Sequence, residues 1–256
     1  MTSPARALKD SGVVVWRQLI QLPRIPEVLV FALIQPVMFV VLFRYVFGGA
    51  IQTPGESYVN YLMPGIFAQT VAFGAVASGI GLAEDLRRGI IDRFRSLPMA
   101  RSAVLVGRTV SDLVRNAAVV AVMMGVGLLV GFRPSGSLGA IIVAFGLLFL
   151  TSFAFWWIGV VIAISMKMVE AVQSAGFIWL FPLTFASSAF VPTDSMPSWL
   201  QGFAVNQPFT VVVNAVRALF LAQPVGNLVW LSVVWMGGIS AVMIPLATRQ
   251  YRRRTG

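Results

Sequence analysis

The sequence predicts an all-α polytopic membrane protein with six transmembrane helices, and three observations predict this class. Hydrophobic residues make up 58% of the 256 residues. Charged residues make up only 11%, against about 25% in an ordinary soluble domain. Long stretches without Asp, Glu, Lys or Arg recur along the chain, and their lengths approach the roughly 20 apolar residues that a spanning helix needs. A mean hydropathy of +0.85 agrees with a chain that lies in a bilayer.

The uncharged stretches predict where the spans lie. A seventh candidate, residues 195–222, is too polar to span, because its apolar portion Phe209–Leu221 is short and carries Asn214 and Arg217. A charge at mid-bilayer costs about 2.5–3.5 kcal/mol. We therefore interpret this segment as re-entrant helices on the extracellular side, before the last span. The six expected spans are residues 27–47, 61–83, 110–131, 138–165, 170–191 and 226–247.

The distribution of basic residues predicts the orientation. With six spans, 16 of the 19 Lys and Arg residues lie on the side of the two termini, and only Arg44, Arg133 and Arg217 lie on the other. Because cytoplasmic loops carry the excess of Lys and Arg, we expect both termini in the cytoplasm. The net charge of +10 then reflects topology and does not indicate nucleic acid as a partner.

Two terminal segments lie outside the expected spans. Residues 1–26 include Leu8, Trp16 and Leu19 at helical spacing among basic and amide side chains, a pattern typical of an amphipathic helix in the headgroup layer. The alternative is a disordered basic tail. Residues 248–256 are expected to form a basic cytoplasmic tail.

The loop between spans 2 and 3 combines charge with one apolar stripe. Leu86, Ile90, Phe94 and Leu97 share a helical face, and Pro98 ends the helix. A short helix of this kind over residues 84–98 is suited to dock into a groove of another protein. The alternative is a solvated connector.

Beyond this loop, Arg108, Asp112 and Arg115 recur on one helical face. We interpret them as an interfacial charge ladder in which Arg108 and Asp112 can pair.

The residues that catalysis most often uses are absent. The chain contains no His and no Cys, and its two lysines, Lys9 and Lys167, do not follow glycine. A Walker A loop requires Gly-Lys followed by Ser or Thr. We therefore expect no enzyme activity, no metal site and no cofactor in this chain. The glycine-rich stretches 74–81 and 125–131 lie inside spans and predict close helix packing.

Two motifs stand in the chain, one in the loop after the second expected span and one before the last span. The first motif is Glu84-Asp85…Arg88-Gly89-Ile-Ile-Asp92-Arg-Phe94-Arg-Ser-Leu97-Pro98…Arg101, and the second is Phe190-Val-Pro192…Met196-Pro197…Trp199-Leu200…Asn206…Pro208…Ala215…Arg217. These motifs and the order of the parts resemble the membrane permease subunit of a type-2 ABC exporter, specifically the daunorubicin-resistance group. The second motif differs from the family by the residue inserted in Asn206-Gln-Pro208.

This resemblance implies a function. The chain would be a dimeric permease in a bacterial cell membrane, working with two ATPase subunits that bind ATP and magnesium, and it would export a drug, lipid or glycolipid. The charged loop would be the coupling helix, and spans 2 and 5 would line the substrate path. A polysaccharide-exporting permease and a non-transporting structural or assembly protein are the alternatives. The implied ATPase-coupling residues are Glu84, Asp85, Arg88, Asp92, Arg93, Phe94, Arg95 and Arg101, and the implied path residues are Gln69, Phe73, Phe177 and Phe181.

Overall fold

A computed structural model describes residues 26–51, 53, 56–88 and 101–255 of the chain, and within these ranges every regular element is a helix. The predicted amphipathic helix over residues 1–26 lies almost wholly outside the described residues and stays a prediction. The elements are α2 (Pro26–Val41), the π-helix η2 (Leu42–Phe47), α3 (Tyr58–Arg87), α5 (Arg101–Leu129), α6 (Leu138–Ser165), α7 (Val169–Phe185), the 3-10 helix η3 (Thr193–Ser195), α8 (Ser198–Asn206), α9 (Pro208–Phe220) and α10 (Leu228–Thr255).

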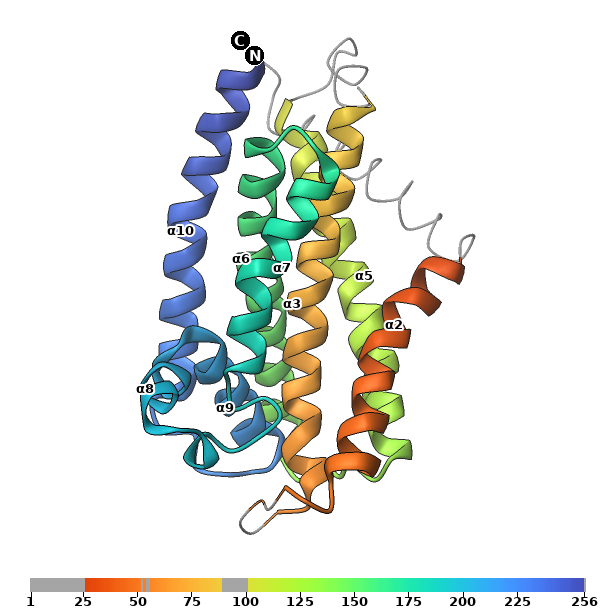
Figure 1. The fold of residues 1–256 in the computed structure, drawn as a ribbon, viewed down its shortest axis with the longest axis vertical. Helices are drawn as coiled ribbons and strands as arrows, with labels where there is room; N and C mark the ends of the chain where they lie inside the picture. Colours follow the sequence, from red (N-terminus) through yellow and green to blue (C-terminus); the bar gives the residue numbers. More distant parts are fainter. Residues whose placement is uncertain (1–25, 52, 54–55, 89–100, 256) are drawn as a thin grey trace.

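The long helices form an antiparallel bundle. Helices α2, α3, α5, α6, α7 and α10 run along the long axis, each opposite in direction to the one before it (Figure 1). The short helices α8 and α9 gather at the end of the bundle where α7 stops and α10 starts (Figure 1). The charged end of α3 and the C-terminal end of α10 lie at the opposite end.

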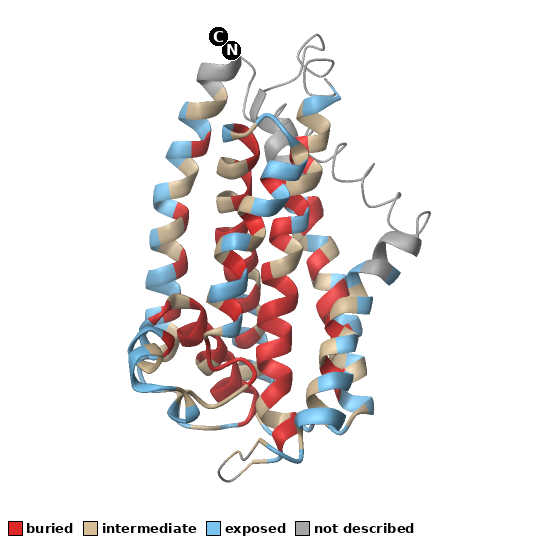
Figure 2. Cartoon of the chain, viewed as in Figure 1, coloured by how far each residue is buried: buried red, intermediate tan, exposed pale blue. Residues whose placement is uncertain are grey.

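Helix α3 is the centre of the bundle. It contacts α2, α5, α6, α7 and α9, and most of its side chains are buried, whereas α10 is exposed along much of its length (Figure 2). The exposed side chains are largely apolar, as at Ile142 (63% exposed), Trp230 (68%) and Val242 (62%). So much exposed apolar surface is expected where lipid replaces water. The chain is a multi-pass membrane protein.

Within the part of the chain that the structure describes, four helices are long and apolar enough to cross a membrane: Tyr58–Arg87, Thr109–Leu129, Leu138–Ser165 and Leu228–Tyr251. They correspond to the second, third, fourth and sixth expected spans. The other two expected spans appear as shorter apolar helices, Ala32–Phe47 and Val169–Phe185.

Helix α7 ends at Phe185, six residues before the predicted end of the fifth span. The Gln207 side-chain amide donates to the carbonyls of Leu183 (2.9 Å) and Ala186 (2.7 Å). The Ser187 hydroxyl donates to the Thr184 carbonyl. These side chains satisfy carbonyls that a helix end leaves without partners. The inserted residue of the Asn206-Gln-Pro208 sequence is therefore the one that caps α7.

Three other described helices extend well beyond their predicted spans. Helix α5 begins at Arg101, although its span was predicted from residue 110. Helix α3 continues through Arg87, and α10 continues through Thr255. The span prediction stopped at charged residues, but backbone hydrogen bonding continues through them. Residues 84–87, predicted to begin the charged loop helix, are the last turn of α3, and most of the predicted tail 248–256 is helical.

Glycines allow α3 and α6 to cross closely. A Cβ atom on Gly79 would lie 3.0 Å from the Cα of Gly159, and one on Gly159 would lie 3.2 Å from the Ala75 carbonyl oxygen. The packing predicted for the stretch 74–81 is therefore confirmed at Gly79. In the stretch 125–131, a Cβ atom on Gly127 would lie 2.8 Å from the Met63 side chain of α3, whereas no described atom lies within 4 Å of the Cβ position at Gly125.

Candidate functional site

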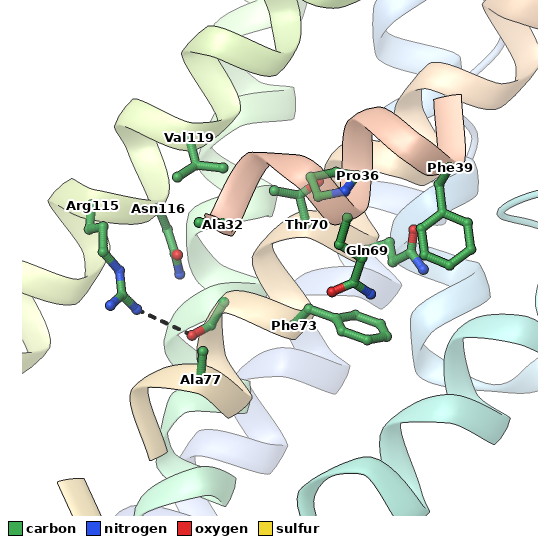
Figure 3. A pocket seen from close by; sticks show the side chains of 12 residues that line it. Ala32, Pro36, Phe39, Gln69, Thr70, Phe73, Ala77, Arg115, Asn116 and Val119 are labelled. Atoms are coloured by element: carbon green, nitrogen blue, oxygen red, sulfur yellow. Dashed lines mark hydrogen bonds between the residues drawn. The ribbon is translucent and has the colours of Figure 1, made fainter. Parts of the chain in front are cut away.

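A cavity of about 420 Å³ lies between α2, α3 and α5 (Figure 3). Its wall is mostly apolar, with amide, hydroxyl and guanidinium groups at a few positions. Cavities of this size hold drug-sized molecules. The lining residues are Ala32, Gln35, Pro36, Phe39, Gln69, Thr70, Phe73, Gly74, Ala77, Arg115, Asn116 and Val119.

Gln69 is the buried polar group of this cavity that lacks a partner. Its residue is 2% exposed, and neither the nitrogen nor the oxygen of its amide has a hydrogen-bond partner among the described residues. Figure 3 shows the Gln69 amide beside Phe73, facing the α2 residues that line the same cavity. Burying a polar group without a partner costs about 1–3 kcal/mol, so this side chain lowers stability unless something binds it.

The four predicted path residues lie together. Gln69 and Phe73 line the cavity. Phe73 contacts two rings of α7, with its centroid 5.6 Å from that of Phe181 and 6.1 Å from that of Phe177. Phe177 and Phe181 are not lining residues of the cavity, so the four residues form a cluster that begins in the cavity and continues onto α7.

The aromatic cluster extends beyond the predicted residues. The Phe181 and Phe185 ring centroids are 5.6 Å apart, and Phe185 lies 5.8 Å from Phe39 of α2. Phe39 also lines the cavity. Phenylalanines of α2, α3 and α7 therefore form a continuous aromatic surface, which sequence alone could not assign because its members come from three separate helices.

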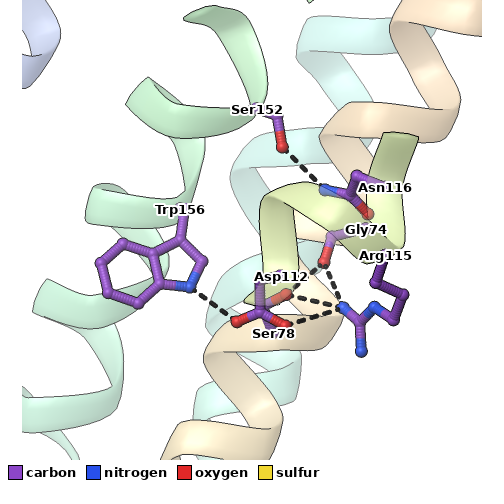
Figure 4. A network of polar contacts seen from close by, with 7 residues as sticks. All are labelled: Gly74, Ser78, Asp112, Arg115, Asn116, Ser152 and Trp156. Carbon is purple, nitrogen blue, oxygen red and sulfur yellow. Dashed lines mark hydrogen bonds and ion pairs between the residues drawn. The ribbon is translucent and has the colours of Figure 1, made fainter. Parts of the chain in front are cut away.

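At the wall of the cavity, Asp112 and Arg115 of α5 form part of a polar network (Figure 4). Their nearest charged atoms are 3.4 Å apart. The Trp156 indole nitrogen of α6 donates to Asp112 at 3.0 Å, and Arg115 donates to the Ser78 hydroxyl of α3 at 2.7 Å. Asp112 is only 8% exposed. These two residues therefore connect three helices inside the bundle. The predicted pairing of Arg108 with Asp112 stays a prediction, because the Arg108 side chain lies outside the described residues.

Asn116 continues this network into the cavity wall. Its amide nitrogen donates to the Ser152 hydroxyl at 2.7 Å. A Cβ atom on Gly74 would overlap the Asn116 side-chain oxygen, so glycine at position 74 gives α5 room to approach α3. Asn116 and Arg115 are lining residues that the sequence-based site prediction missed, because their partners lie on other helices.

The predicted ATPase-coupling residues divide into two groups. Glu84, Asp85 and Arg88 lie at the C-terminal end of α3, where Glu84 and Arg88 form an exposed ion pair at 3.6 Å. Asp92, Arg93, Phe94 and Arg95 lie outside the described residues, and Arg101 is known only as the first residue of α5. Their role in coupling stays a prediction.

The described residues contain no group of three or more Asp or Glu side chains that could hold a metal ion. The chemistry of this site is that of a binding surface built from aromatic, amide and hydroxyl groups.

Comparison with known proteins gives the family. The pattern of the ABC-2 type transporter family matches residues 11–221. The chain belongs to the ABC-2 type transporter family. The match extends from the predicted N-terminal amphipathic segment through α9, so it includes the cavity, the polar network and the charged loop.

Individual relatives of this ABC-2 protein are permeases. A daunorubicin resistance ABC transporter permease protein of Streptomyces coeruleorubidus is 32% identical over 253 residues, 98% of this chain and 89% of the relative. A Mycobacterium tuberculosis ABC transporter permease protein, named for doxorubicin resistance, is 27% identical over 233 residues, 87% of this chain and 80% of the relative. A transport permease of Cyanophora paradoxa is 29% identical over 219 residues, 83% of this chain and 74% of the relative. The predicted resemblance to ABC exporter permeases is confirmed.

Proposed function

We propose that this chain is the permease subunit of an ABC exporter that moves hydrophobic or amphipathic drug-like molecules out of the cell. The observation that carries the proposal is the 32% identity over 98% of the chain to a permease named for daunorubicin resistance. The aromatic surface of α2, α3 and α7 supports it, because flat apolar molecules bind well to aromatic side chains. Gln69, Phe73, Phe177 and Phe181 form the substrate path.

The proposed topology has six spans in the bacterial cell membrane, with both termini in the cytoplasm. The spans are α2 with η2, α3, α5, α6, α7 and α10, and α8 with α9 forms the extracellular re-entrant segment. The alternating directions of the long helices support this topology. The excess of arginine at the charged ends of α3 and α10 supports the orientation.

In this proposal, residues 84–98 and Arg101 contact the ATPase subunits and couple ATP hydrolysis to transport. Separate ATPase subunits bind ATP and magnesium, because this chain contains no Gly-Lys pair for a Walker A loop. Two ATPases and two permeases make up the complex. The exposed Glu84–Arg88 ion pair supports a docking surface here, since its side chains are 46% and 69% exposed and free to exchange partners.

Doxorubicin uptake by inside-out vesicles tests the proposal. The vesicles contain the tagged chain together with the ABC ATPase that co-purifies with it, and uptake is followed by the quenching of doxorubicin fluorescence after ATP is added. We expect ATP-dependent uptake from these vesicles and no ATP hydrolysis by the purified chain alone. Absence of a co-purifying ATPase, or ATPase activity of the chain alone, would contradict the proposed division of labour.

A pair of charge reversals tests the coupling helix. We expect Asp92→Arg with Arg93→Asp to lower uptake at least tenfold, because it reverses both charges at the docking surface. The matched control is Lys167→Glu with Glu170→Lys, which reverses one charge in the loop between α6 and α7 and one in the first turn of α7, and it should leave uptake within twofold of wild type. Equal uptake in the two double variants would place the docking surface elsewhere.

A further inference from the structure

The polar groups of the cavity differ in whether they already have partners. The Thr70 hydroxyl donates to the Ile66 carbonyl at 2.7 Å, and the Asn116 amide donates to Ser152. Arg115 is bound to Asp112 and Ser78. Among the described polar groups that line the cavity, only the Gln69 amide is buried and has no hydrogen-bond partner at either its nitrogen or its oxygen.

The chemistry of a partner for Gln69 follows from these surroundings. A carboxamide offers N–H donors and a carbonyl acceptor, so a hydroxyl, which both donates and accepts, matches it. Arg115, the charged group on the cavity wall, is already paired with Asp112, so a charged ligand group would lose its hydration without finding a free partner there. The rest of the wall is dominated by Pro36, Phe39 and Phe73 and favours an apolar body.

We propose that the cavity between α2, α3 and α5 binds a neutral, mostly apolar small molecule whose hydroxyl group is held by the Gln69 amide. The site is built by a single copy of the chain, and its occupancy requires neither ATP nor a partner subunit. The volume of about 420 Å³ accommodates a molecule of fused-ring size. Binding supplies Gln69 with the hydrogen bonds that the fold does not provide.

Three probes that share the pyrene ring system separate the contributions of the hydroxyl group and of charge. They are 1-pyrenemethanol, 1-methylpyrene and the cation of 1-pyrenemethylamine. Tryptophan emission overlaps pyrene absorption, so binding to the full chain in detergent is measured as energy transfer from its tryptophans. We expect saturable binding. The affinity for pyrenemethanol should exceed that for methylpyrene at least fivefold, and the affinity for the ammonium probe should be the lowest of the three.

Gln69→Leu tests the role of the amide. We expect the preference for pyrenemethanol over methylpyrene to fall below twofold in this variant, because leucine fills a similar volume without polar atoms. The same change at Gln173, which is exposed on α7, should preserve the fivefold preference. We also expect Gln69→Leu to unfold at or above the wild-type temperature, since it removes an unpaired buried amide.

Ala77→Phe tests the cavity independently of Gln69. Ala77 lines the cavity and is exposed, so a phenyl ring there fills the space and should weaken all three probes at least fivefold. If Gln69→Leu does not fold, Ala77→Phe still tests whether the probes bind in this cavity. Equal affinities of the three probes for wild type, an unchanged preference in folded Gln69→Leu, or unchanged binding in Ala77→Phe would each overturn the proposal. The proposal rests on the substrate path proposed above, but these binding measurements contain neither ATP nor an ATPase, so their failure is distinguishable from a failure of ATP-driven export.

Discussion

Arg217 of α9 is bound to Tyr61 of α3 in two ways. Its Nε donates to the Tyr61 carbonyl at 3.0 Å, and its guanidinium carbon lies 3.7 Å from the centroid of the Tyr61 ring. The same guanidinium donates to the Ser188 carbonyl at 2.6 Å and to the Asn214 side-chain oxygen at 2.7 Å. Arg217 is 6% exposed. Arg217, whose charge is unfavourable in a spanning helix, therefore helps to join α9 to α3 at the centre of the bundle.

Arg217→Lys should destabilise the bundle, because lysine cannot reproduce the planar arrangement of donors or the stacking on Tyr61. We expect a loss of at least about 2 kcal/mol, since hydrogen bonds to charged groups contribute about 1.5–3 kcal/mol each. The measurement is thermal unfolding in detergent. Arg133→Lys is the matched control, because Arg133 is exposed and bonds only the nearby Leu128 and Phe132 carbonyls through its side chain. Similar losses in both variants would show that burial of Arg217 contributes little.

Asp112 and Arg115 should be energetically coupled. Asp112→Asn keeps an acceptor for Trp156 but removes the negative charge 3.4 Å from Arg115, so it should destabilise the fold. Adding Arg115→Gln should recover part of the loss, with a coupling energy of about 0.5–3 kcal/mol, as residues in one network commonly show. A double-mutant cycle of unfolding free energies measures this energy. Strict additivity of the two single changes would mean that the ion pair is not a stabilising unit.

A larger side chain at Gly159 should destabilise the fold, whereas the same change at Gly146 of the same helix should not. Gly159→Val places atoms against Ala75 and Gly79 of α3, and overpacking of a close contact costs about 1–3 kcal/mol. Gly146→Val is the control, because no described atom lies within 4 Å of a Cβ at that position of α6. Gly159→Val should therefore unfold at a clearly lower temperature than Gly146→Val. Equal temperatures would contradict the close crossing of α3 and α6.

The orientation in the membrane can be measured without first removing native thiols, because the chain contains no cysteine. We expect Ser198→Cys, at the exposed start of α8, to react with an impermeant maleimide added to intact cells. Met168→Cys, in the exposed loop between α6 and α7, should react only after the membrane is permeabilised. The reverse pattern would invert the proposed topology.

Much of the fold was predictable from local composition. The prediction of a span over 138–165 agrees with α6, Leu138–Ser165, because an apolar run there follows Ser137, whose hydroxyl accepts from the Ala140 backbone nitrogen. The fifth span was predicted too long, because the end of α7 depends on Gln207. That residue lies more than 20 positions along the chain from the carbonyls it caps, and no local pattern contains this information.

The site was only partly predictable. Gln69 and Phe73 were identified from the family resemblance, and both line the cavity. Arg115 and Asn116 were not identified, because a charged or amide side chain near a span end has the same sequence pattern whether it faces the headgroups or another helix. The partners Ser78 and Ser152 decide between these positions.

The membrane class, the positions of most long helices, the distribution of charge and the family could all be inferred from the amino-acid sequence. These properties depend on residue type and on spacing along one helix, so no knowledge of the packing is needed. The contacts of Asp112 with Trp156, of Gly79 with Gly159, and of Arg217 with Tyr61 across 156 residues of chain became visible only in the folded bundle. Such contacts arise from how helices pack against one another, and in a bilayer, where apolar surfaces are all equally solvated by lipid, hydrophobicity does not specify which faces meet.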